Sequence, residues 1–589
     1  MSTRHAHQSS FRFEWKRDVL VGLGFMILAT FFYGSILDQF WTADDPPLMA
    51  AIYRNGIWAH FYDPAVWAEN LPEPPIWGVF TPWIMVSFGV DWWVGGLNPI
   101  FAYIHQLVSL SVVLFLLHKV LRHFFSFYVS LYACMLFMIS LPVREAAHYL
   151  MERHYIEGLG FFLLSMLCYE RALRKPASIQ WSWALGSGFF YFMACSAKEI
   201  YAPLAALLPL LPWGQWRRRY LVLMPCAFFA LAYLLWRAYM LDPEFISGYG
   251  GGHFNLGLKQ WSSFGTEWVL ATSMSATWQV GVLALAAALL VVALGTSLMA
   301  WLRAIALSLL TILPGYPFLG ILPTRLCFLS ILVMVIGFSC ILDMFSRHGR
   351  LAFSFRKNTE LLISGVNIGQ WLGGGMGLLF GLLMAPGYFS SITPVAKPEM
   401  ERFKQEGRFV LSATPEQGLI NASNRPLPFW WFFSSLARLR AGVMHDPAHP
   451  AVCYDPCACS PLIPRKGLRI TAQGIQEALW PVSWDEGVCG SLTKPLSVSL
   501  SFEKERRFPL LKWRLGPYGY NGMYVFQLED RGADVFGFEP GVWPKGSHPV
   551  GRKGLFMRVR WLEYTGSSVI SPPFEIRPDM QPIEWKRSE

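Results

Sequence analysis

Two adjacent carboxylates, Asp44 and Asp45, follow the first long apolar run of the chain after a few residues. Charge placed this close to a membrane is costly unless water or a ligand solvates it. A carboxylate held near the membrane surface can also remove the proton of an attacking hydroxyl group. We therefore favour a chemical role over the alternative, in which the pair only caps a short helix. Adjacent carboxylates titrate as a pair, so Asp44 is the first choice of base and Asp45 the second.

Cations gather at the ends of three later apolar runs, together with acids and aromatic residues. Arg153 lies in the segment that begins at Pro142, Lys198 lies between two apolar runs, and Arg325 opens another. Lys and Arg form charge-assisted hydrogen bonds with phosphate oxygens, so the cluster indicates an anionic partner such as a phosphate. The alternative is local ion pairing, of Lys198 with a nearby acid and of Arg153 with Glu145 or Glu152.

The elements that must position these residues are apolar runs long enough to cross a bilayer. The run at 19–37 follows a basic tail, residues 1–18, and no small-residue cleavage site follows it, so we expect a signal-anchor helix. Hydropathy indicates roughly eleven spans in all. The further runs lie near 98–117, 125–142, 155–170, 182–196, 200–213, 221–239, 279–299, 304–322, 326–343 and 361–385.

Composition and charge fit this membrane interpretation. The chain is 53% hydrophobic and only 15% charged, and its net charge is +10. Most of the excess Lys and Arg lies in short loops near 119–122, 171–175, 217–219, 303 and 347–357. The positive-inside rule then places the N-terminus in the cytoplasm, and an odd number of spans places the C-terminal third on the opposite side. The basic charge is thus explained by topology, and no nucleic-acid partner is expected.

The C-terminal third reads as a soluble domain. Residues 387–464 are expected to be an irregular linker, and residues 465–589 a β-sandwich-like domain. Leu496, Val498 and Leu500 alternate with serines, which is the period of a half-buried strand. Several such stretches separated by turn signals are typical of a sandwich.

The ten cysteines divide into two groups. Six lie in or beside apolar runs, where buried free thiols are expected. The other four lie in the C-terminal third, where one or two disulfides are expected if that third is outside the cell, with the pairing open. A four-cysteine zinc site is the less favoured alternative. These four are Cys453, Cys457, Cys459 and Cys489.

The order of these motifs resembles that of the GT-C superfamily of membrane glycosyltransferases, in particular the protein O-mannosyltransferases and aminoarabinose transferases. The acidic pair after the first span matches, and the stretch from Phe80 through Asn98-Pro99 to His105 resembles the end of that family's first outer loop. Lys198-Glu199 resembles a Ser-x-Lys-Glu turn, and the resemblance covers roughly residues 15–345. Two departures leave the acceptor class and subfamily open: the usual His-Pro is Leu141-Pro142, and Arg325 is followed by Leu.

The resemblance implies a mainly α, GT-C-like bundle over residues 19–386, with a long first outer loop at 38–97. It implies an inverting transfer of a sugar from a polyprenyl-phosphate donor to a hydroxyl of a glycan, lipid or protein. Arg153, Lys198 and Arg325 would hold the donor phosphate. Glu145 and, more loosely, Glu199, His154 and Tyr155 would support the site or contact the sugar. No cofactor is expected; a divalent metal at Asp44-Asp45 is not favoured, because this branch generally manages without one.

The resemblance and the lack of an organelle signal place the chain in the cytoplasmic (inner) membrane of a bacterium, in contact with membrane lipid, with its C-terminal domain in the periplasm. Two other classes of function remain open. A transporter or flippase would carry charged or broken spans near the bilayer midplane, often in matching halves. A membrane-anchored glycan-binding protein would need far fewer spans and would leave the Asp and Lys clusters unexplained.

Overall fold

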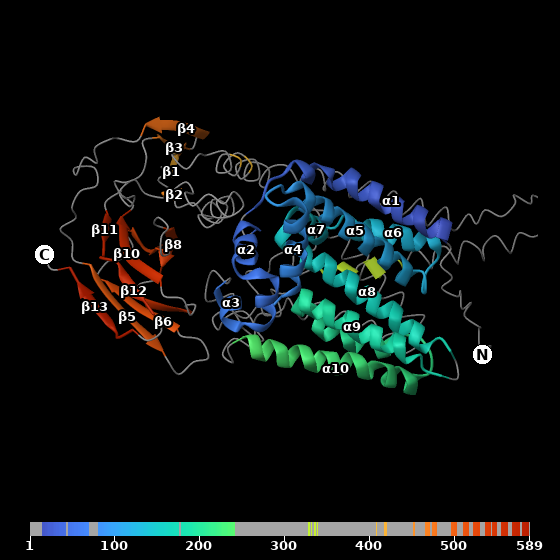
Figure 1. Ribbon diagram of the computed structural model, residues 1–589. Coiled ribbons are helices and arrows are strands. Elements are labelled where there is room, and N and C mark those ends of the chain that lie inside the picture. Colours follow the sequence, from blue (N-terminus) through green and yellow to red (C-terminus); the bar gives the residue numbers. More distant parts are fainter. Residues whose placement is uncertain are drawn as a thin grey trace, which may run out of the picture. The chain divides into compact units, whose positions relative to one another are not determined.

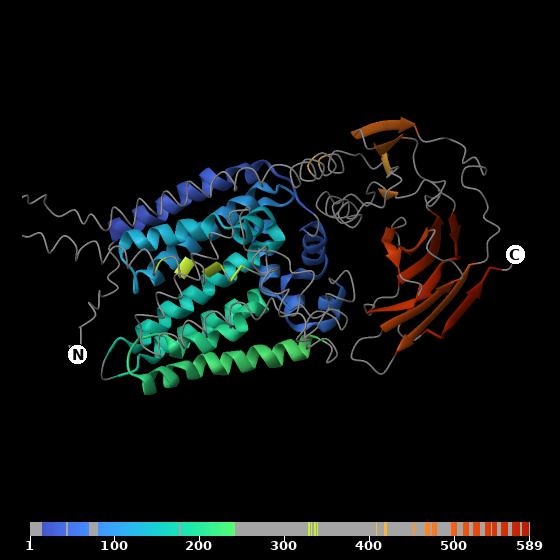
Figure 2. The ribbon, with the colours of Figure 1, turned by 180° about the vertical axis from the view of Figure 1, so that it is seen from behind.

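The structure of the chain is a computed structural model, shown in Figures 1 and 2. It describes residues 15–42, 45–69, 80–175 and 178–241, short pieces between 328 and 408, and the strands given below with a few flanking residues. The chain divides into two compact units. One comprises residues 1–38, 101–236 and 252–397, and the other residues 39–100, 237–251 and 398–589.

The first unit is a set of apolar helices that run alongside one another (Figures 1 and 2). Three of them are long and apolar enough to cross a membrane: α1 (Trp15–Tyr33) with its 3-10 extension η1 (Gly34–Asp38), α5 (Ile100–Leu121) and α10 (Trp216–Met240). α6 (Phe127–Met138) and α7 (Leu141–His148) form a fourth, bent candidate with an angle of 61°. These helices support the expectation of a multi-pass membrane protein.

The remaining helices of this unit follow the expected apolar runs. α8 (Arg153–Leu173) and α9 (Trp181–Ala197) match the runs at 155–170 and 182–196, and η3 (Leu150–Glu152) precedes α8. The run at 200–213 forms instead a 3-10 helix, η4 (Glu199–Leu210), which contains Pro203 and Pro209. Because proline lacks the N–H that an α-helix interior needs, these two residues account for the difference. The runs after residue 241 lie outside the described residues, apart from the pieces at 328–339.

Close contacts hold α8, α9 and α10 together. The Ser165 hydroxyl on α8 donates to the Ser187 carbonyl on α9 at 2.8 Å. A Cβ at Gly188 would lie 2.9 Å from the carbonyl carbon of Pro225, so only glycine permits this approach of α9 to α10. Two of the described cationic loops, near 171–175 and 217–219, lie at the same end of these helices, where the Tyr169 hydroxyl donates to the Arg219 carbonyl at 2.7 Å.

The second unit contains the first outer loop, which folds into three helices: α2 (Asp45–Tyr62), α3 (Pro64–Glu69) and α4 (Trp83–Gly95). A hydrogen bond of 2.9 Å from the Trp41 indole to the Leu97 carbonyl joins the start of the loop to its end. The rings of Trp67 and Phe80 pack edge to face at 5.1 Å. The loop is therefore a folded substructure.

The strands of the second unit form three sheets, of which the first is a four-stranded sheet in the order β2-β1-β3-β4. The second, antiparallel sheet has the order β11-β10-β7-β8 with β12 paired to β10, and the third has the order β13-β5-β6-β9. The strands are β1 (Gln417–Ile420), β2 (Val452–Cys453), β3 (Lys466–Thr471), β4 (Gly474–Leu479), β5 (Ser497–Glu503), β6 (Leu510–Gly516), β7 (Gly522–Glu529), β8 (Phe536–Val542), β9 (Lys545–Pro549), β10 (Leu555–Glu563), β11 (Ser568–Ile570), β12 (Phe574–Ile576) and β13 (Ile583–Lys586).

One apolar cluster joins the second and third sheets. Val498 and Leu500 of β5 are buried in the same cluster as Val559 of β10 and Ile576 of β12. Two antiparallel sheets that share a core form the arrangement expected of a sandwich. Two short strands, β1 and β2, lie inside the segment that the sequence predicts to be an irregular linker. They are only four and two residues long, too short for a detectable alternation.

The four cysteines whose side chains the structure describes are buried free thiols, as the sequence predicts. They are Cys134, Cys168, Cys195 and Cys226. The backbone of Cys453 lies in β2, whereas its side chain and the whole of Cys457, Cys459 and Cys489 lie outside the described residues. The predicted disulfides therefore stay a prediction.

Candidate functional site

The first turns of α8 carry a buried ionic cluster. The side chain of Arg153 is fully buried, and its Nε lies 3.6 Å from Oε1 of Glu157, one helical turn later. Its Nη1 donates to the Ala102 carbonyl of α5 at 3.0 Å. The same Glu157 oxygen lies 3.2 Å from Nε2 of His105, whose side chain is 30% exposed. One carboxylate thus bridges an arginine and a histidine and links the starts of α5 and α8.

Lys198 lies beside the same turn of α8, at the junction of α9 and η4. The residue is buried, and its Nζ is 3.6 Å from the Glu199 carboxylate and 5.4 Å from the centre of the Tyr155 ring. A carboxylate and an aromatic face both stabilise a desolvated ammonium group. The Glu199 side chain is 24% exposed and that of Lys198 is 5% exposed, so the surface reaches the pair mainly through Glu199. The arrangement can present a positive charge to an anion that approaches this side.

Glycine and tyrosine packing fixes the backbone that carries Lys198. The Tyr201 hydroxyl donates a hydrogen bond to the carbonyl of Tyr155. The Tyr201 ring lies flat against α8 at Gly158, where an added Cβ would be 2.3 Å from Cε2 of the ring. Because Tyr201 follows Lys198 by only three residues, this contact sets the distance between η4 and α8.

The described piece that follows Arg325 also reaches this cluster. The Phe328 ring lies 6.1 Å from the Tyr155 ring and 5.5 Å from the Phe137 ring. Arg325 itself lies outside the described residues, so its predicted phosphate contact stays a prediction.

The acidic pair is described for one of its two members. Asp45 begins α2, is fully buried, and accepts hydrogen bonds at Oδ2 from the Thr42 backbone N–H at 2.8 Å and hydroxyl at 3.0 Å. A carboxylate that returns to the N–H three residues earlier is part of a capping arrangement. Asp44 lies outside the described residues. Among the residues that the structure describes, no group of three or more His, Cys, Asp or Glu side chains is placed to hold a metal ion.

The other expected site residues are distributed over the same end of the first unit. His154 is buried, and its ring packs against that of Tyr155 at 4.7 Å. Glu145 is half-buried near the end of α7. The structure brings Lys198, Tyr155 and Glu199 together, with His154 against Tyr155, and Arg153 begins the same helix, α8.

The structure gives Arg153 a carboxylate partner, Glu157, that the sequence analysis did not consider beside Glu145 and Glu152. The spacing of four residues on a helix that begins at Arg153 was the available signal. Glu157 lies inside the apolar run near 155–170, for which hydropathy alone predicts a membrane span. His105 was noted only within the family resemblance, and its contact with Glu157 is long-range.

No protein-family model matches this sequence, and no curated protein matches it. Among solved structures, the chain is similar to ArnT from Cupriavidus metallidurans bound to undecaprenyl phosphate, with 13% identity and a TM-score of 0.43. That match covers 74% of this chain and 89% of the other. The apo state of the same protein matches with 12% identity and a TM-score of 0.45, over 77% of this chain and 92% of that one. At identities this low, activity has to be argued from the residues of this chain.

Proposed function

We propose that this chain is a membrane glycosyltransferase that moves a sugar from a polyprenyl-phosphate donor to an acceptor hydroxyl on the outer face of a bacterial cytoplasmic membrane. The observation that carries the proposal is the buried Lys198 ammonium, held between the Glu199 carboxylate and the Tyr155 ring at the ends of apolar helices. A desolvated cation attracts a phosphate far more strongly than one in water.

A phosphate of the donor would approach Lys198 from the side on which Glu199 is partly exposed. It would then share the ammonium with Glu199. Arg153 is buried and bound to Glu157, so we assign it to holding the first turn of α8 and the Lys198 site in place, with direct phosphate contact only after rearrangement. Arg325 is the second proposed phosphate ligand.

The reaction needs a base but no general acid. The acceptor oxygen forms a bond with the anomeric carbon while the bond from that carbon to the phosphate oxygen breaks, and the bonding pair leaves with the polyprenyl phosphate. The acceptor proton passes to a carboxylate. Lys198 and Arg325 stabilise the charge that grows on the phosphate. Attack opposite the leaving group inverts the anomeric carbon.

We assign the base to Asp44 before Asp45. The Asp45 carboxylate is buried and already accepts two hydrogen bonds from Thr42, so we assign it to holding the start of α2. Capping by Asp45 would fix the backbone that carries Asp44. The pair divides its two roles in this way: one carboxylate shapes the loop and the other reacts.

Transfer of label from radiolabelled polyprenyl-phosphate sugars in membranes tests the proposal. The wild-type chain is compared with Asp44→Asn, Asp45→Asn and Lys198→Ala, and with Lys175→Ala as a control. Lys175 is an exposed cation in the loop between α8 and α9, remote from the Lys198 site. Wild type and Lys175→Ala should transfer label at equal rates. Lys198→Ala and Asp44→Asn should transfer label at least about 100-fold more slowly, the usual effect of removing a catalytic base or a charge-stabilising group.

Equal transfer by all variants would show that the site is wrong. Absence of transfer by intact wild-type protein with every donor would contradict the glycosyltransferase proposal and favour transport of a lipid-linked glycan.

A further inference from the structure

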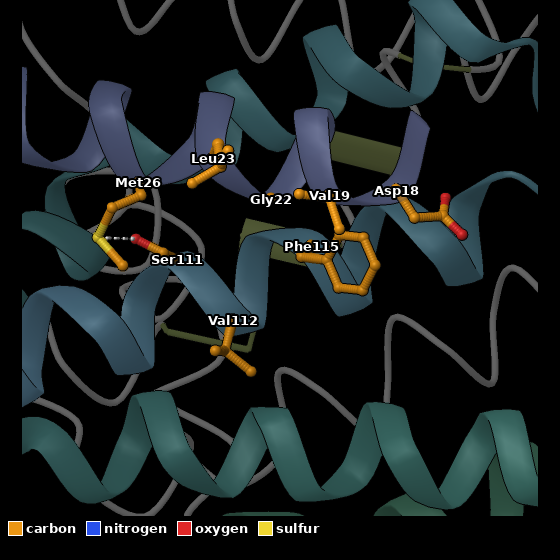
Figure 3. Close-up of a pocket in the computed structure, with 8 residues that line it drawn as sticks. All are labelled: Asp18, Val19, Gly22, Leu23, Met26, Ser111, Val112 and Phe115. Carbon is orange, nitrogen blue, oxygen red and sulfur yellow. Dashed lines mark hydrogen bonds between the residues drawn. The ribbon is translucent and has the colours of Figure 1, made fainter. Parts of the chain in front are cut away.

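An apolar groove runs between α1 and α5, far along the helices from Lys198, and nothing in the proposed function uses it. Its volume is about 330 Å³. Figure 3 shows Asp18 at one end and Met26 at the other, with Ser111 and Phe115 of α5 beside the side chains of α1. The apolar lining consists of Val19, Gly22, Leu23 and Met26 from α1 and Val112 and Phe115 from α5.

Each of the two polar side chains in the groove, Ser111 and Asp18, has a partner within the protein. The Ser111 hydroxyl donates to the Leu107 carbonyl at 2.7 Å and lies 3.5 Å from the Met26 sulfur. Oδ1 of Asp18 accepts from the Lys119 ammonium at 2.7 Å, an ion pair in which both side chains are largely buried. The length of the groove therefore suits a hydrocarbon chain and offers little to a polar molecule.

The position of the groove along α1 fits a chain that enters from the membrane surface. α1 begins at Trp15, whose ring is 68% exposed, and tryptophan favours the interface between lipid and water. The groove starts three residues later, at Asp18, and ends at Met26. At the rise per residue of an α-helix, this span is about 12 Å long. The end of the groove at Asp18 thus lies about where lipid headgroups sit.

The charge at that end favours an anionic headgroup. Lys16 and Arg17 are exposed, and the Arg17 guanidinium lies 4.2 Å from the centre of the Phe127 ring. The nearby Asp18 carboxylate is paired with Lys119, so Lys16 and Arg17, together with Arg122 beside the same Phe127 ring, make the local potential positive. The sequence places this end in the cytoplasmic leaflet, where anionic lipids attract basic residues near a span.

We propose that the groove between α1 and α5 binds one acyl chain of an anionic phospholipid, whose phosphate lies against Lys16 and Arg17. Gly22 leaves the space for that chain, because its ideal Cβ would lie 4.0 Å from Phe115, an ordinary contact distance. A longer side chain at this position fills the groove without a clash at Cβ.

Lipid titration of the purified full-length chain, followed by native mass spectrometry, tests the proposal. The probes are phosphatidylglycerol and phosphatidylcholine. Gly22→Leu is compared with Gly24→Leu, because a Cβ at Gly24 meets nothing within 4 Å and Gly24 does not line the groove. Gly22→Leu should bind phosphatidylglycerol about tenfold more weakly than wild type, as expected when roughly two methylene groups lose their site. Gly24→Leu should bind like wild type.

The double variant Lys16→Gln/Arg17→Gln tests the headgroup and does not depend on the folding of Gly22→Leu. It should lose roughly thirtyfold in affinity for phosphatidylglycerol and little for phosphatidylcholine. Equal affinity of Gly22→Leu and Gly24→Leu would overturn the groove as the binding site. Equal binding of the two lipids by wild type, or an unchanged preference in the double variant, would overturn the anionic headgroup.

Discussion

A methyl group added at Gly158 should disturb the Lys198 site from a distance. The new Cβ of Gly158→Ala would lie 2.3 Å from Cε2 and 2.9 Å from Cδ2 of Tyr201, a ring that is fully buried. The ring must move, and with it the hydroxyl that donates to the Tyr155 carbonyl. The displacement passes to Lys198 through three residues of backbone.

Three contributions set the expected loss in the free energy of unfolding. Overpacking costs about 1–3 kcal/mol. Loss of a buried hydrogen bond costs about 1–3 kcal/mol. Replacement of a helical glycine by alanine stabilises the helix by about 1 kcal/mol. The net expected loss in the free energy of unfolding is roughly 3 kcal/mol.

The assay combines a denaturation midpoint with sugar transfer at a temperature where the variant is folded. Gly186→Ala is the control, because its Cβ would lie 3.7 Å from the Cys168 sulfur, an ordinary contact. Transfer by Gly158→Ala should fall even when the protein is intact, whereas Gly186→Ala should match wild type. If Gly158→Ala is as stable and as active as Gly186→Ala, then Tyr201 does not set the position of Lys198.

Three further outcomes are expected. Glu157→Ala leaves the buried Arg153 guanidinium without this carboxylate and should lower the free energy of unfolding by about 3–5 kcal/mol. An unchanged denaturation midpoint would show that the pair of Arg153 and Glu157 does not stabilise the fold. Gly188→Ala places a Cβ 2.9 Å from the backbone of Pro225 and should cost about 1–3 kcal/mol, clearly more than a change at Gly186. Burial and the nearby Arg and Lys side chains lower the pKa of His123 from 6.5 to about 4. As the pH falls, the unfolded chain takes up this proton before the folded chain does, so the free energy of unfolding should fall by up to about 3 kcal/mol between pH 6.5 and 4. His123→Gln should reduce this pH dependence when denaturation is measured against pH.

Hydropathy predicted the helices of the described membrane region well, because a helix in lipid must satisfy its backbone within the segment and bury no polar side chain without a partner. The run from Val19 to Leu37 forms most of α1 and η1. Val498 and Leu500 form the buried face of β5, and Leu496 is buried just before this strand. Both signals are local in the sequence.

The site depended on contacts that local patterns do not encode. The bond from His105 to Glu157 joins residues in different helices, and the packing of Tyr201 on Gly158 depends on how two elements approach. The sequence could place Lys198 and Arg153 at the ends of apolar runs, but it could not show that Arg153 would be fully buried. The groove between α1 and α5 likewise arises from tertiary packing.

The release of free polyprenyl phosphate by the purified chain in liposomes tests the central claim most directly. The liposomes hold a mixture of polyprenyl-phosphate sugars and acceptor glycans or lipids. The account predicts that wild type releases polyprenyl phosphate in step with sugar transfer, and that Lys198→Ala releases little although it is folded. Movement of the intact donor across the bilayer by wild type, with no polyprenyl phosphate released from any donor, would contradict it.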